Sequence, residues 1–516
     1  MDTKALRQKI LDLAIRGKLV PQDPSDEPAS VLLERIREQK KQMVKEGKLK
    51  AKDIKNDTII FVGEDNLHYE KFADGTVKCI EEEIPFEVPE GWEWTRLGSL
   101  FSTITGSTPS TKDASLYGDE YPFYKPTDLD AGFDVCFSED TVSEKGYKNG
   151  RILPVYSVLV TCIGATIGKT GYIRNSGICN QQINAILPNT FILPEYTYFC
   201  MCSEFEQQQI WTNSSATTLP ILNKSKFDSL FFPVPPKAQQ TRTVERIKEL
   251  LHFVEIIQQE KRTLQETIKL TKSKILDLAI RGKLVPQDPN DEPASVLLER
   301  IRAEKEELIK QGNTKRGKKE SIIFRGDDNS YYEKVGNNVN CIDEKIPFEL
   351  PEGWAFIRLN TAWKLISGRD LSPSEYNDKN DGIPYITGAS NFKNGHISLI
   401  RWTPVPQVIT RRGDLLLTCK GTIGEIAHNN FGEAHIARQI MAIRNIYSLN
   451  VDFLALYIEY SMTKIKQAAK GLIPGISRED ILNLVIPIPP TKEQENICTK
   501  LKVTFSAIEH IEKSLN

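Results

Sequence analysis

Apolar residues recur at helical spacing through a long segment in the middle of the chain. Residues 237–283 contain no proline or glycine before Gly282, and Pro236 precedes them. The apolar positions with 3-4 spacing in this segment are Val244, Ile247, Leu251, Val254, Leu264, Ile268, Ile275 and Leu278. This pattern predicts an amphipathic spacer helix with a coiled-coil-like seam, roughly 70 Å long at 1.5 Å per residue.

Two other regions instead alternate short β-rich runs with turns. The region 95–236 contains SVLVTCIG, TGYI and INAILP, and the region 354–490 contains LLLTCKG and MAIRNIY. Each region also contains one segment with helical spacing, 194–211 in the first and 451–469 in the second. We therefore expect two α/β modules, each with a twisted sheet, in a chain of the α+β class.

The chain repeats itself once. Residues 10–37, ILDLAIRGKLVPQDPSDEPASVLLERIR, recur at 275–302 with a single difference, Ser25 against Asn290. TIIFVGEDNLHYEK then matches SIIFRGDDNSYYEK, and IPFEVPEGWEWTRL matches IPFELPEGWAFIRL. The modules that follow have diverged, although Gln182 still falls opposite Gln439. A duplicated framework therefore carries two individual modules.

The phase of the repeat indicates how the chain ends fit the framework. Residues 491–516 match the start of the spacer helix, and residues 1–17 match its end. The two ends together supply one copy of what 237–283 supplies in one piece, which predicts a pseudo-two-fold cyclic repeat with antiparallel spacer helices. Two unrelated surface helices are the alternative.

The repeat also sets the predicted domain boundaries. Further helices are expected at 29–46 and 294–311, after proline-rich breaks. The division is an N-terminal helical region 1–57, a lead-in 58–94, a first recognition module 95–236, a central spacer 237–320, a second lead-in 321–353, a second module 354–490 and a C-terminal spacer helix 491–516.

Composition excludes several classes of protein. The 516 residues include 40% hydrophobic and 26% charged residues, as expected for a globular chain. The charged N-terminal sequence lacks a signal-peptide core, and no run of about 18 apolar residues predicts a membrane span. Nine cysteines lack metal-ligand spacing and are read as reduced thiols of a cytoplasmic protein.

Motifs that suggest catalysis are incomplete. GATIGKT at 164–170 has three residues between its glycines where a phosphate-binding loop needs four, so a tight turn between strands is the better interpretation. The Pro-Pro pairs precede Lys237 and Thr491 rather than the aromatic residue of an adenine methyltransferase, and no glycine-rich cofactor loop is found. The six histidines are dispersed, without the spacing of a metal site. We therefore predict no catalytic residues, metal or cofactor in this chain.

The arrangement as a whole resembles the specificity subunits of type I restriction-modification systems. The resemblance rests on two unlike modules that begin near PEGW and RL, end near PP and Q, and are separated by ILDLAIRGKLVPQDP blocks. It implies that each module is a target recognition domain for half of a bipartite DNA site. It also implies that the helices set the spacing and dock two methylation subunits, which bind S-adenosylmethionine and methylate adenine, while separate restriction subunits cut.

Candidate DNA-binding residues are polar or basic side chains in predicted loops, because Arg, Gln and Asn pair with base edges and Lys with phosphates. In the first module they are Thr105, Ser107, Thr108, Lys112, Lys125, Thr166, Lys169, Gln181, Gln182 and Thr217. In the second they are Ser367, Arg369, Ser372, Asn391, Lys393, Lys420, Thr422, Arg438, Gln439 and Lys470. For Gln182 and Gln439, base contact and a shared structural hydrogen bond stand as equal alternatives. Trp92 and Trp354 are expected to be core anchors.

Two other functions stay open at this point. One is a nuclease or methyltransferase with unrecognised motifs, and the other is a coiled-coil scaffold whose modules bind something other than DNA. The net charge of −2 does not by itself indicate a nucleic-acid-binding protein. The first module carries 10 basic and 13 acidic residues, a net charge of −3, and the second carries 15 and 11, a net charge of +4. The first module therefore needs a local basic face to bind DNA.

Overall fold

The computed structural model divides into two compact units, Met1–Lys261 and Arg262–Asn516. It describes residues 2–47, 49–51, 54–215, 219–312, 321–393, 395–447, 449–468 and 475–515, without side chains for 463–468. The boundary between the units falls inside one continuous helix, so each unit combines a part of that helix with one module. Among the described residues, no helix is both long and apolar enough to cross a membrane.

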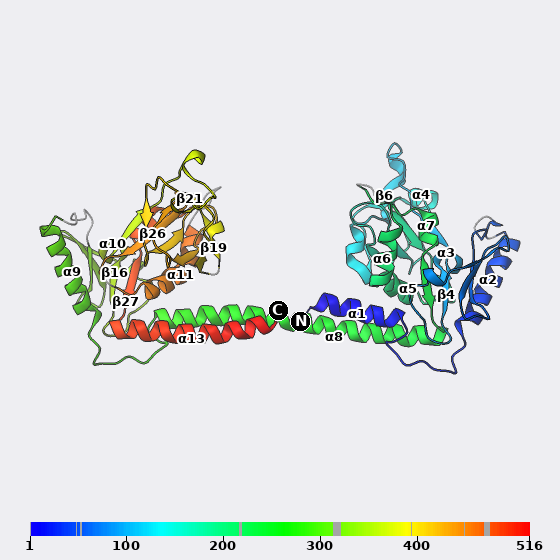
Figure 1. The fold of residues 1–516 in the computed structure, drawn as a ribbon, viewed down its shortest axis with the longest axis horizontal. Coiled ribbons are helices and arrows are strands. Elements are labelled where there is room, and N and C mark those ends of the chain that lie inside the picture. The colour runs from blue at the N-terminus through cyan, green and yellow to red at the C-terminus, as the bar shows by residue number, and fades with distance from the viewer. Residues whose placement is uncertain are drawn as a thin grey trace. The chain divides into compact units, whose positions relative to one another are not determined.

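The predicted spacer helix is α8, Lys237–Ile280 (Figure 1). In the first unit α8 lies against α1, Thr3–Ile15, and in the second against α13, Thr491–Leu515. Ion pairs set the direction of both pairings. In the first unit Glu255 of α8 pairs with Arg7 of α1, and Arg242 of α8 pairs with Asp26, which follows α1. In the second unit Lys272 of α8 pairs with Glu512 of α13, and Lys492 of α13 pairs with Asp291, which follows α8. In both units higher numbers in one segment meet lower numbers in the other, which confirms the antiparallel arrangement.

The apolar seam of α8 differs from the predicted one at its C-terminal end. Val244, Ile247 and Val254 are buried as expected, but Leu264 is 40% exposed. Leu264 lies beyond the reach of both partners, because α1 begins four residues before Arg7 and α13 ends three residues after Glu512. Further along α8 the predicted Ile268 is buried, but the next buried positions are Leu276, Ala279 and Ile280 rather than the predicted Ile275 and Leu278, which are half-buried.

Each half has the same helix followed by the same small lead-in. In the first unit the helix is α2 (Ala29–Lys45), and the lead-in consists of β1 (Ile59–Val62), β2 (His68–Lys71), β3 (Val77–Cys79) and η2 (Glu81–Glu83). In the second the helix is α9 (Ala294–Lys310), and the lead-in consists of β13 (Ser321–Arg325), β14 (Tyr331–Val335), β15 (Asn338–Cys341) and η5 (Asp343–Lys345). The strands form antiparallel sheets in the orders β1-β2-β3 and β13-β14-β15. The predicted helices at 29–46 and 294–311 are confirmed.

The first module contains short strands around one four-stranded antiparallel sheet, β5-β11-β8-β9. Its elements are β4 (Glu93–Arg96), α3 (Leu97–Leu100), β5 (Thr103–Thr105), η3 (Ala114–Leu116), β6 (Tyr117–Tyr124), η4 (Asp128–Asp134), β7 (Thr141–Val142), α4 (Glu144–Asn149), β8 (Val158–Thr161), β9 (Thr170–Tyr172), β10 (Ile178–Cys179), β11 (Ile183–Ile186), α5 (Pro194–Met201), α6 (Glu204–Asn213), α7 (Lys224–Asp228) and β12 (Phe231–Val234). Strand β12 pairs with β4, and β6 lies between β10 and β7.

The second module repeats this plan with the sheet β17-β26-β23-β24 and the closing pair β16-β27. Its elements are β16 (Ala355–Arg358), α10 (Leu359–Ala362), β17 (Trp363–Ser367), η6 (Pro373–Glu375), β18 (Ile383–Ile386), η7 (Ala389–Asn391), β19 (Phe392–Lys393), β20 (His396–Ile397), β21 (Trp402–Thr403), β22 (Ile409–Thr410), β23 (Leu415–Thr418), β24 (Ile426–His428), β25 (Ala434–Ile436), β26 (Ile440–Asn445), α11 (Val451–Ala468), α12 (Arg478–Leu482) and β27 (Val485–Ile488).

One predicted helix is wrong in detail. Residues 194–211 were expected to form a single helix, but the chain breaks between α5 and α6. Ser203 adopts an extended conformation there, and its hydroxyl accepts a hydrogen bond from the backbone N–H of Glu206. This N-cap favours the start of a new helix, because the hydroxyl satisfies a backbone N–H of the first turn of α6 that has no partner within the helix.

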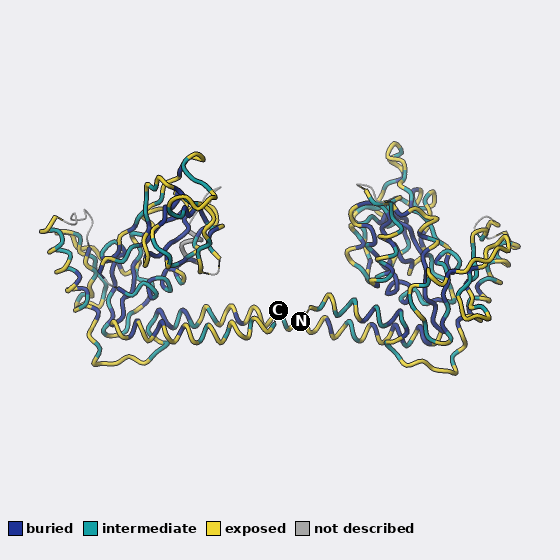
Figure 2. The backbone as a smooth tube through the Cα atoms, in the orientation of Figure 1, coloured by how far each residue is buried: buried dark blue, intermediate teal, exposed yellow. Residues whose placement is uncertain are grey.

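Each unit has one principal core that joins its module to its spacer helices. In the first unit Ile10 and Ala14 of α1 and Val244 and Ile247 of α8 share a cluster with Phe232 of β12. The second unit repeats the arrangement with residues of α8, α13 and β27. Figure 2 shows the buried backbone inside each module and the exposed outer faces of the spacer helices. The position of each module on its own spacer helices is therefore fixed by packing.

Candidate nucleic-acid interface

The ends of the four-stranded sheet bring several predicted loops together in the first module. In the antiparallel register, Thr105 of β5 faces Asn184 of β11, and Thr161 of β8 faces Ile183. The end of β5, the start of β11, the end of β8 and the start of β9 therefore lie at one edge of the sheet. We call this edge, with residues 106–108, 162–169, 180–182 and 219–221, the loop edge.

Backbone hydrogen bonds hold the loop edge in place. The N–H of Cys162 donates to the carbonyl of Gln182 (2.7 Å), and the N–H of Gly106 donates to that of Ile183 (2.9 Å). A Cβ on Gly106 would lie 2.0 Å from the carbonyl oxygen of Asn180, so only glycine fits there. The N–H of Leu222 also donates to the carbonyl of Cys162 (2.8 Å), which ties the chain at 219–221 to this edge.

The second module builds its loop edge, residues 368–370, 419–425, 437–439 and 475–476, with the same bonds. The N–H of Cys419 donates to the carbonyl of Gln439 (2.8 Å), and the N–H of Gly368 donates to that of Ile440 (3.0 Å). Gly368 is again sterically required, since a Cβ there would lie 2.1 Å from the carbonyl oxygen of Ala437. The matched positions of Gln182 and Gln439 are thus confirmed as a backbone feature.

The side chains of the two glutamines differ. Gln182 is half-buried, and its Oε1 accepts a hydrogen bond from Asn180 Nδ2 (2.9 Å). Gln439 is exposed, and its amide lies over Gly388, where a Cβ would come 2.3 Å from Oε1. The shared structural hydrogen bond therefore belongs to the backbone, and base contact by either side chain stays a prediction.

Other first-module candidates lie on or beside the loop edge. Ser107 is half-buried, Thr108 is exposed and donates to Gln181, and Thr166 is exposed in the β8–β9 loop. That loop joins two strands of the sheet, which confirms the tight-turn interpretation of GATIGKT. Lys112 is exposed further along the chain.

The two remaining described lysines among these candidates are already paired with carboxylates. The ammonium of Lys169 lies 2.7 Å from Asp130, and that of Lys125 forms an ion pair with Asp140. These acidic partners offset much of the positive charge that each lysine would present to a phosphate. Thr217 lies outside the described residues.

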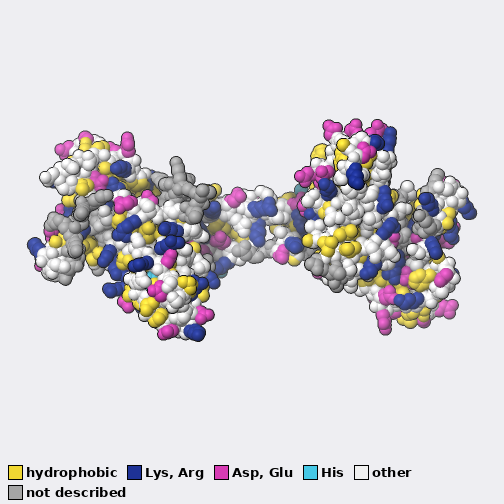
Figure 3. Space-filling model, turned by 90° about the horizontal axis from the view of Figure 1, so that it is seen from above, with side chains coloured by type: hydrophobic (Ala, Val, Ile, Leu, Met, Phe, Trp, Pro, Cys, Tyr) yellow, Lys and Arg dark blue, Asp and Glu magenta, His cyan; other side chains and the backbone are white. Residues whose placement is uncertain are grey.

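The second loop edge is more basic. Arg369 and Lys420 are exposed, and neither has an ion-pair partner among the described residues. Arg438 is exposed and pairs with Asp370 at 2.6 Å. Figure 3 shows Lys and Arg side chains gathered over the middle of the second unit, at the left, whereas on the first unit they are dispersed among Asp and Glu.

One second-module candidate, Asn391, has a structural role. Asn391 is buried, its Oδ1 accepts bonds from Thr387 and Gly388, and its Nδ2 donates to the carbonyl of Ser398. With its polar atoms bonded internally, Asn391 is a structural residue, and we withdraw it as a base-reading candidate.

The remaining second-module candidates differ in their surroundings. Ser372 caps η6 in a capping box with Glu375. Lys393 is exposed on β19, Thr422 is exposed in the β23–β24 loop, and the hydroxyl of Ser367 accepts a bond from Arg478 (3.2 Å). Lys470 lies outside the described residues.

Two arginines at the loop edges were missed by sequence reasoning. Arg151 is exposed and donates to the carbonyl of Thr105 (2.5 Å), and Arg478 is placed by its bond to Ser367. Arg151 follows α4 and is distant in sequence from the other loop-edge residues, so no local pattern pointed to it. Arg478 follows the N-cap Ser477 of α12 and could have been suspected from the cap signal.

A buried histidine supports the second loop edge. His435 Nε2 bonds to the carbonyl of Arg369 (2.8 Å), and Nδ1 accepts from the N–H of Val408 (3.1 Å). Burial lowers the pKa of His435, although its bonds to Arg369 and Val408 act in the opposite direction. The neutral ring therefore links Arg369 to the segment before β22.

Matched ion pairs attach each lead-in to its module. Arg96 makes a bidentate contact with Glu70 (2.7 and 3.0 Å), and Arg358 makes the same contact with Glu333 (2.7 and 2.9 Å). Burial of Glu70 acts to raise its pKa, but hydrogen bonds from Arg96 and Thr58 lower it overall. These contacts explain the arginine of the repeated RL at the start of each module.

The two entrance tryptophans are core anchors, as predicted. Trp92 and Trp354 are buried, and their indole N–H groups donate to Gln239 (2.9 Å) and Glu493 (2.8 Å) at the start of the spacer helices. Within the described residues, no group of three or more His, Cys, Asp or Glu is placed to hold a metal ion.

A family model described as "Type I restriction modification DNA specificity domain" matches residues 89–266 and 351–516. The chain belongs to this family. The two matches contain the two modules with their loop edges, so the duplicated plan corresponds to two copies of one DNA specificity domain.

Curated relatives agree over nearly the whole chain. This sequence is 26% identical to the type I restriction enzyme EcoAI specificity subunit of Escherichia coli, over 96% of this chain and 88% of the relative. It is also 26% identical to the EcoEI specificity subunit of Escherichia coli, over 99% and 90%.

Solved structures show the same fold. A chain from work on complex assembly and conformational transition of the type I R-M system matches with a TM-score of 0.59 and 20% identity, over 84% of this chain and 94% of that one. The HsdS subunit from Thermoanaerobacter tengcongensis matches with a TM-score of 0.51 and 19% identity, over 83% and 93%.

Proposed function

We propose that this chain is the sequence-reading subunit of a type I restriction-modification enzyme, in which each module reads one half of a bipartite DNA target. The observation that carries this proposal is the pair of loop edges. The same backbone bonds, Cys162 to Gln182 and Cys419 to Gln439, hold two loop sets whose side chains differ. A constant support with variable side chains suits readers of two different base sequences.

The spacer helices supply the distance between the two half-sites. Helix α8 is continuous over 44 residues, and α1 and α13 pack against its first and second parts. A packed helix pair holds its ends at a more defined separation than a flexible linker does. The number of residues in α8 then sets the number of unread base pairs.

Surfaces retained in both halves are suited to a partner that binds twice. One face of the β1-β2-β3 sheet exposes Phe61 and Val77, and the matched face of β13-β14-β15 exposes Phe324 and Val339. Phe61 stacks on Tyr69 as Phe324 stacks on Tyr332, with ring centroids 5.9 Å apart in both halves. We infer that two methylation subunits dock on the repeated framework, with restriction subunits joining that assembly.

We assign the catalytic steps to those partner subunits. The tight-turn geometry of GATIGKT and the scattered histidines support a chain without its own catalytic residues, cofactor or metal. S-adenosylmethionine would be bound by the methylation subunit, and this chain would determine which adenines are presented to it.

Insertion of four residues after Gln258 tests the spacer. One added helical turn moves a module by about 5.4 Å, or roughly 1.5 base pairs, and nearly preserves its rotational phase. Genome-wide mapping of methylated adenines should show a target whose unread spacer is one or two base pairs longer, with both half-sites unchanged. A four-residue insertion at Gly413, in an exposed turn before β23 at the opposite end of that strand from the loop edge, is the control and should leave the spacing unchanged. An unchanged spacing after the α8 insertion contradicts the proposal.

A further inference from the structure

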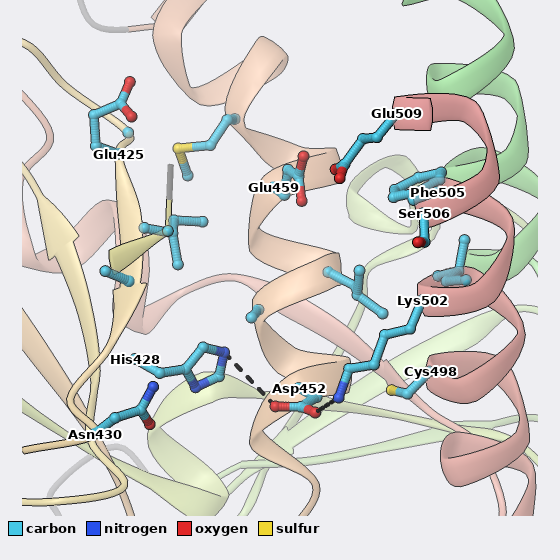
Figure 4. Close-up of a pocket in the computed structure, with 18 residues that line it drawn as sticks. Glu425, His428, Asn430, Asp452, Glu459, Cys498, Lys502, Phe505, Ser506 and Glu509 are labelled. Atoms are coloured by element: carbon cyan, nitrogen blue, oxygen red, sulfur yellow. Dashed lines mark hydrogen bonds and ion pairs between the residues drawn. The ribbon is translucent and has the colours of Figure 1, made fainter. Parts of the chain in front are cut away.

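An open groove lies in the second unit between β24, α11 and the spacer helix α13 (Figure 4). Its volume is about 980 Å³. Leu456, Leu501 and Phe505 supply apolar lining. Figure 4 shows the carboxylates of Glu459 and Glu509 pointing toward the same end of the groove.

In the first unit the corresponding place is occupied by the chain itself. Phe133, at the end of η4, stacks on Tyr172 of β9 (centroids 5.2 Å apart, interplanar angle 8°) and on Phe199 of α5 (5.1 Å, 14°). The ammonium of Lys248 of α8 lies 5.4 Å from the centre of the Phe133 ring. One aromatic side chain thus joins the edge strand, the module helix and the spacer helix.

Matched contacts establish that the two places correspond. Tyr172 faces the first residue of β8, and His428 faces the first residue of β23. Lys248 of the spacer helix pairs with Glu195 of α5 (3.5 Å), and Lys502 pairs with Asp452 of α11 (2.5 Å). In the second module the β19-β20 hairpin lies next to β24, and of this hairpin's described residues Gly395 alone lines the groove. No aromatic side chain of the described residues is seated there as Phe133 is.

The charge of the lining is reversed between the two places. The N–H of Thr161 donates to the carbonyl of Lys169, and that of Thr418 donates to the carbonyl of Glu425, so Lys169 and Glu425 are equivalent. In the first unit Lys169 and Arg174 pair with Asp130 and Asp134, which flank Phe133. An acidic segment therefore fills a basic lining.

In the second unit the lining is acidic. Glu425, Glu459 and Glu509 have no ion-pair partner among the described residues, and Lys502 and His428 of the groove both face Asp452. By the precedent of the first unit, the complementary occupant has a large apolar side chain between basic residues.

We propose that this groove docks a segment of the methylation subunit that carries one large apolar side chain flanked by Lys or Arg. The apolar side chain takes the place that Phe133 has in the first unit, against Leu456 and Phe505. The flanking cations lie against Glu425, Glu459 and Glu509. The identity of the partner rests on the function proposed above, while the chemistry of the segment rests on the groove. It follows that the two halves engage their partners differently, since the first half has filled its own groove.

The test measures binding of the purified methylation subunit to the full chain. The double variant Glu459→Lys, Glu509→Lys should weaken binding of one of two methylation subunits by about tenfold or more, because the cationic segment then meets like charge. Glu509→Lys alone carries the same charge change as the control Glu495→Lys, at an exposed position of α13 outside the groove, and the control should bind as the parent does. Thermal unfolding of all variants checks that the second unit remains folded.

A photoreactive amino acid at Ser506, which lines the groove, provides a measurement in the otherwise unchanged chain. The crosslinked peptide should come from the methylation subunit and contain a large apolar residue next to Lys or Arg. Crosslinks only to DNA or to a second copy of the chain would overturn the proposal. So would equal binding by the groove variant and Glu495→Lys in an assembly that still directs methylation. A parent chain that forms no such assembly would overturn the proposed function and this proposal with it.

Discussion

The loop edges of the two modules present different charges on the same backbone. In the first module Lys125 and Lys169 are paired with aspartates, and the module as a whole has a net charge of −3. In the second, Arg369 and Lys420 are exposed without ion-pair partners among the described residues, and the net charge is +4. Duplication has preserved the support and left the reading surface free to change. The two modules should therefore respond alike to changes in the framework and differently to changes at the loop edges.

The largest shared effect is expected from the ion pairs at the module entrances. Arg96→Ala leaves the buried Glu70 without its bidentate partner, which costs about 3–5 kcal/mol, and Arg358→Ala does the same to Glu333, whose side chain is 14% exposed. Both variants should lower the unfolding free energy of their own module by similar amounts in urea titrations. A cost confined to one module would show that the duplicated framework is not equivalent in the two halves.

A smaller effect is expected on the salt dependence of DNA binding, which should differ between the two modules. Arg369→Ala combined with Lys420→Ala removes two unpaired cations, so the slope of log K against log salt should fall by up to about 0.9 per lost phosphate contact. Lys125→Ala with Lys169→Ala should change the slope less, because aspartates already neutralise those lysines. Lys364→Ala, which removes one cation at the opposite end of β17 from Ser367, is the control and should leave the slope unchanged. Titrations of duplex target at several salt concentrations measure these slopes, and equal changes for both double variants would contradict the comparison.

The smallest expected effect is a pH response limited to the second module. The folded-state pKa of His435 lies below the ordinary value of 6.5, so its contribution to stability is complete above about pH 6.5. That contribution is lost as the pH falls toward the lowered pKa, because the unfolded chain then binds the proton more readily. Hydrogen exchange near Val408, corrected for its intrinsic pH dependence, should increase between pH 7.5 and pH 5.5. The first module contains no histidine and should not respond in this way.

Two histidine variants identify the group that causes this pH response. His435→Gln should remove the pH dependence near Val408, whereas His428→Gln should retain it. An acid-induced increase that persists in His435→Gln would assign the response to another group.

The sequence predicted the parts that depend on local pattern and on the repeat. The spacer helix, the helices after each PQDP block and the entrance tryptophans follow from helical spacing and from two nearly identical segments. The glycines and glutamines of the loop edge could be matched between halves, but their meeting depends on strand register across residues far apart in sequence. The hydrogen bond from Arg151 to Thr105 and the stacking of Phe133 against Tyr172 are long-range in the same way.

Burial explains why the predictions for Asn391 and Leu264 were wrong. Asn391 is a polar residue beside a turn and was expected to face solvent, but it bonds the backbone of Thr387 and Gly388 from the interior. Leu264 fits an apolar spacing and was expected in the seam, but no partner helix reaches it. Spacing identifies which residues share a face, and only the partner decides whether that face is covered.

Exchange of the module at 95–236 for one from another specificity subunit tests the central claim most directly. Methylated adenines would be mapped in cells that carry the hybrid chain and its methylation subunit. One half of the split target should change, while the other half and the number of intervening base pairs remain as before. A target in which both halves change, or in which neither does, would contradict independent reading by two modules on a shared support.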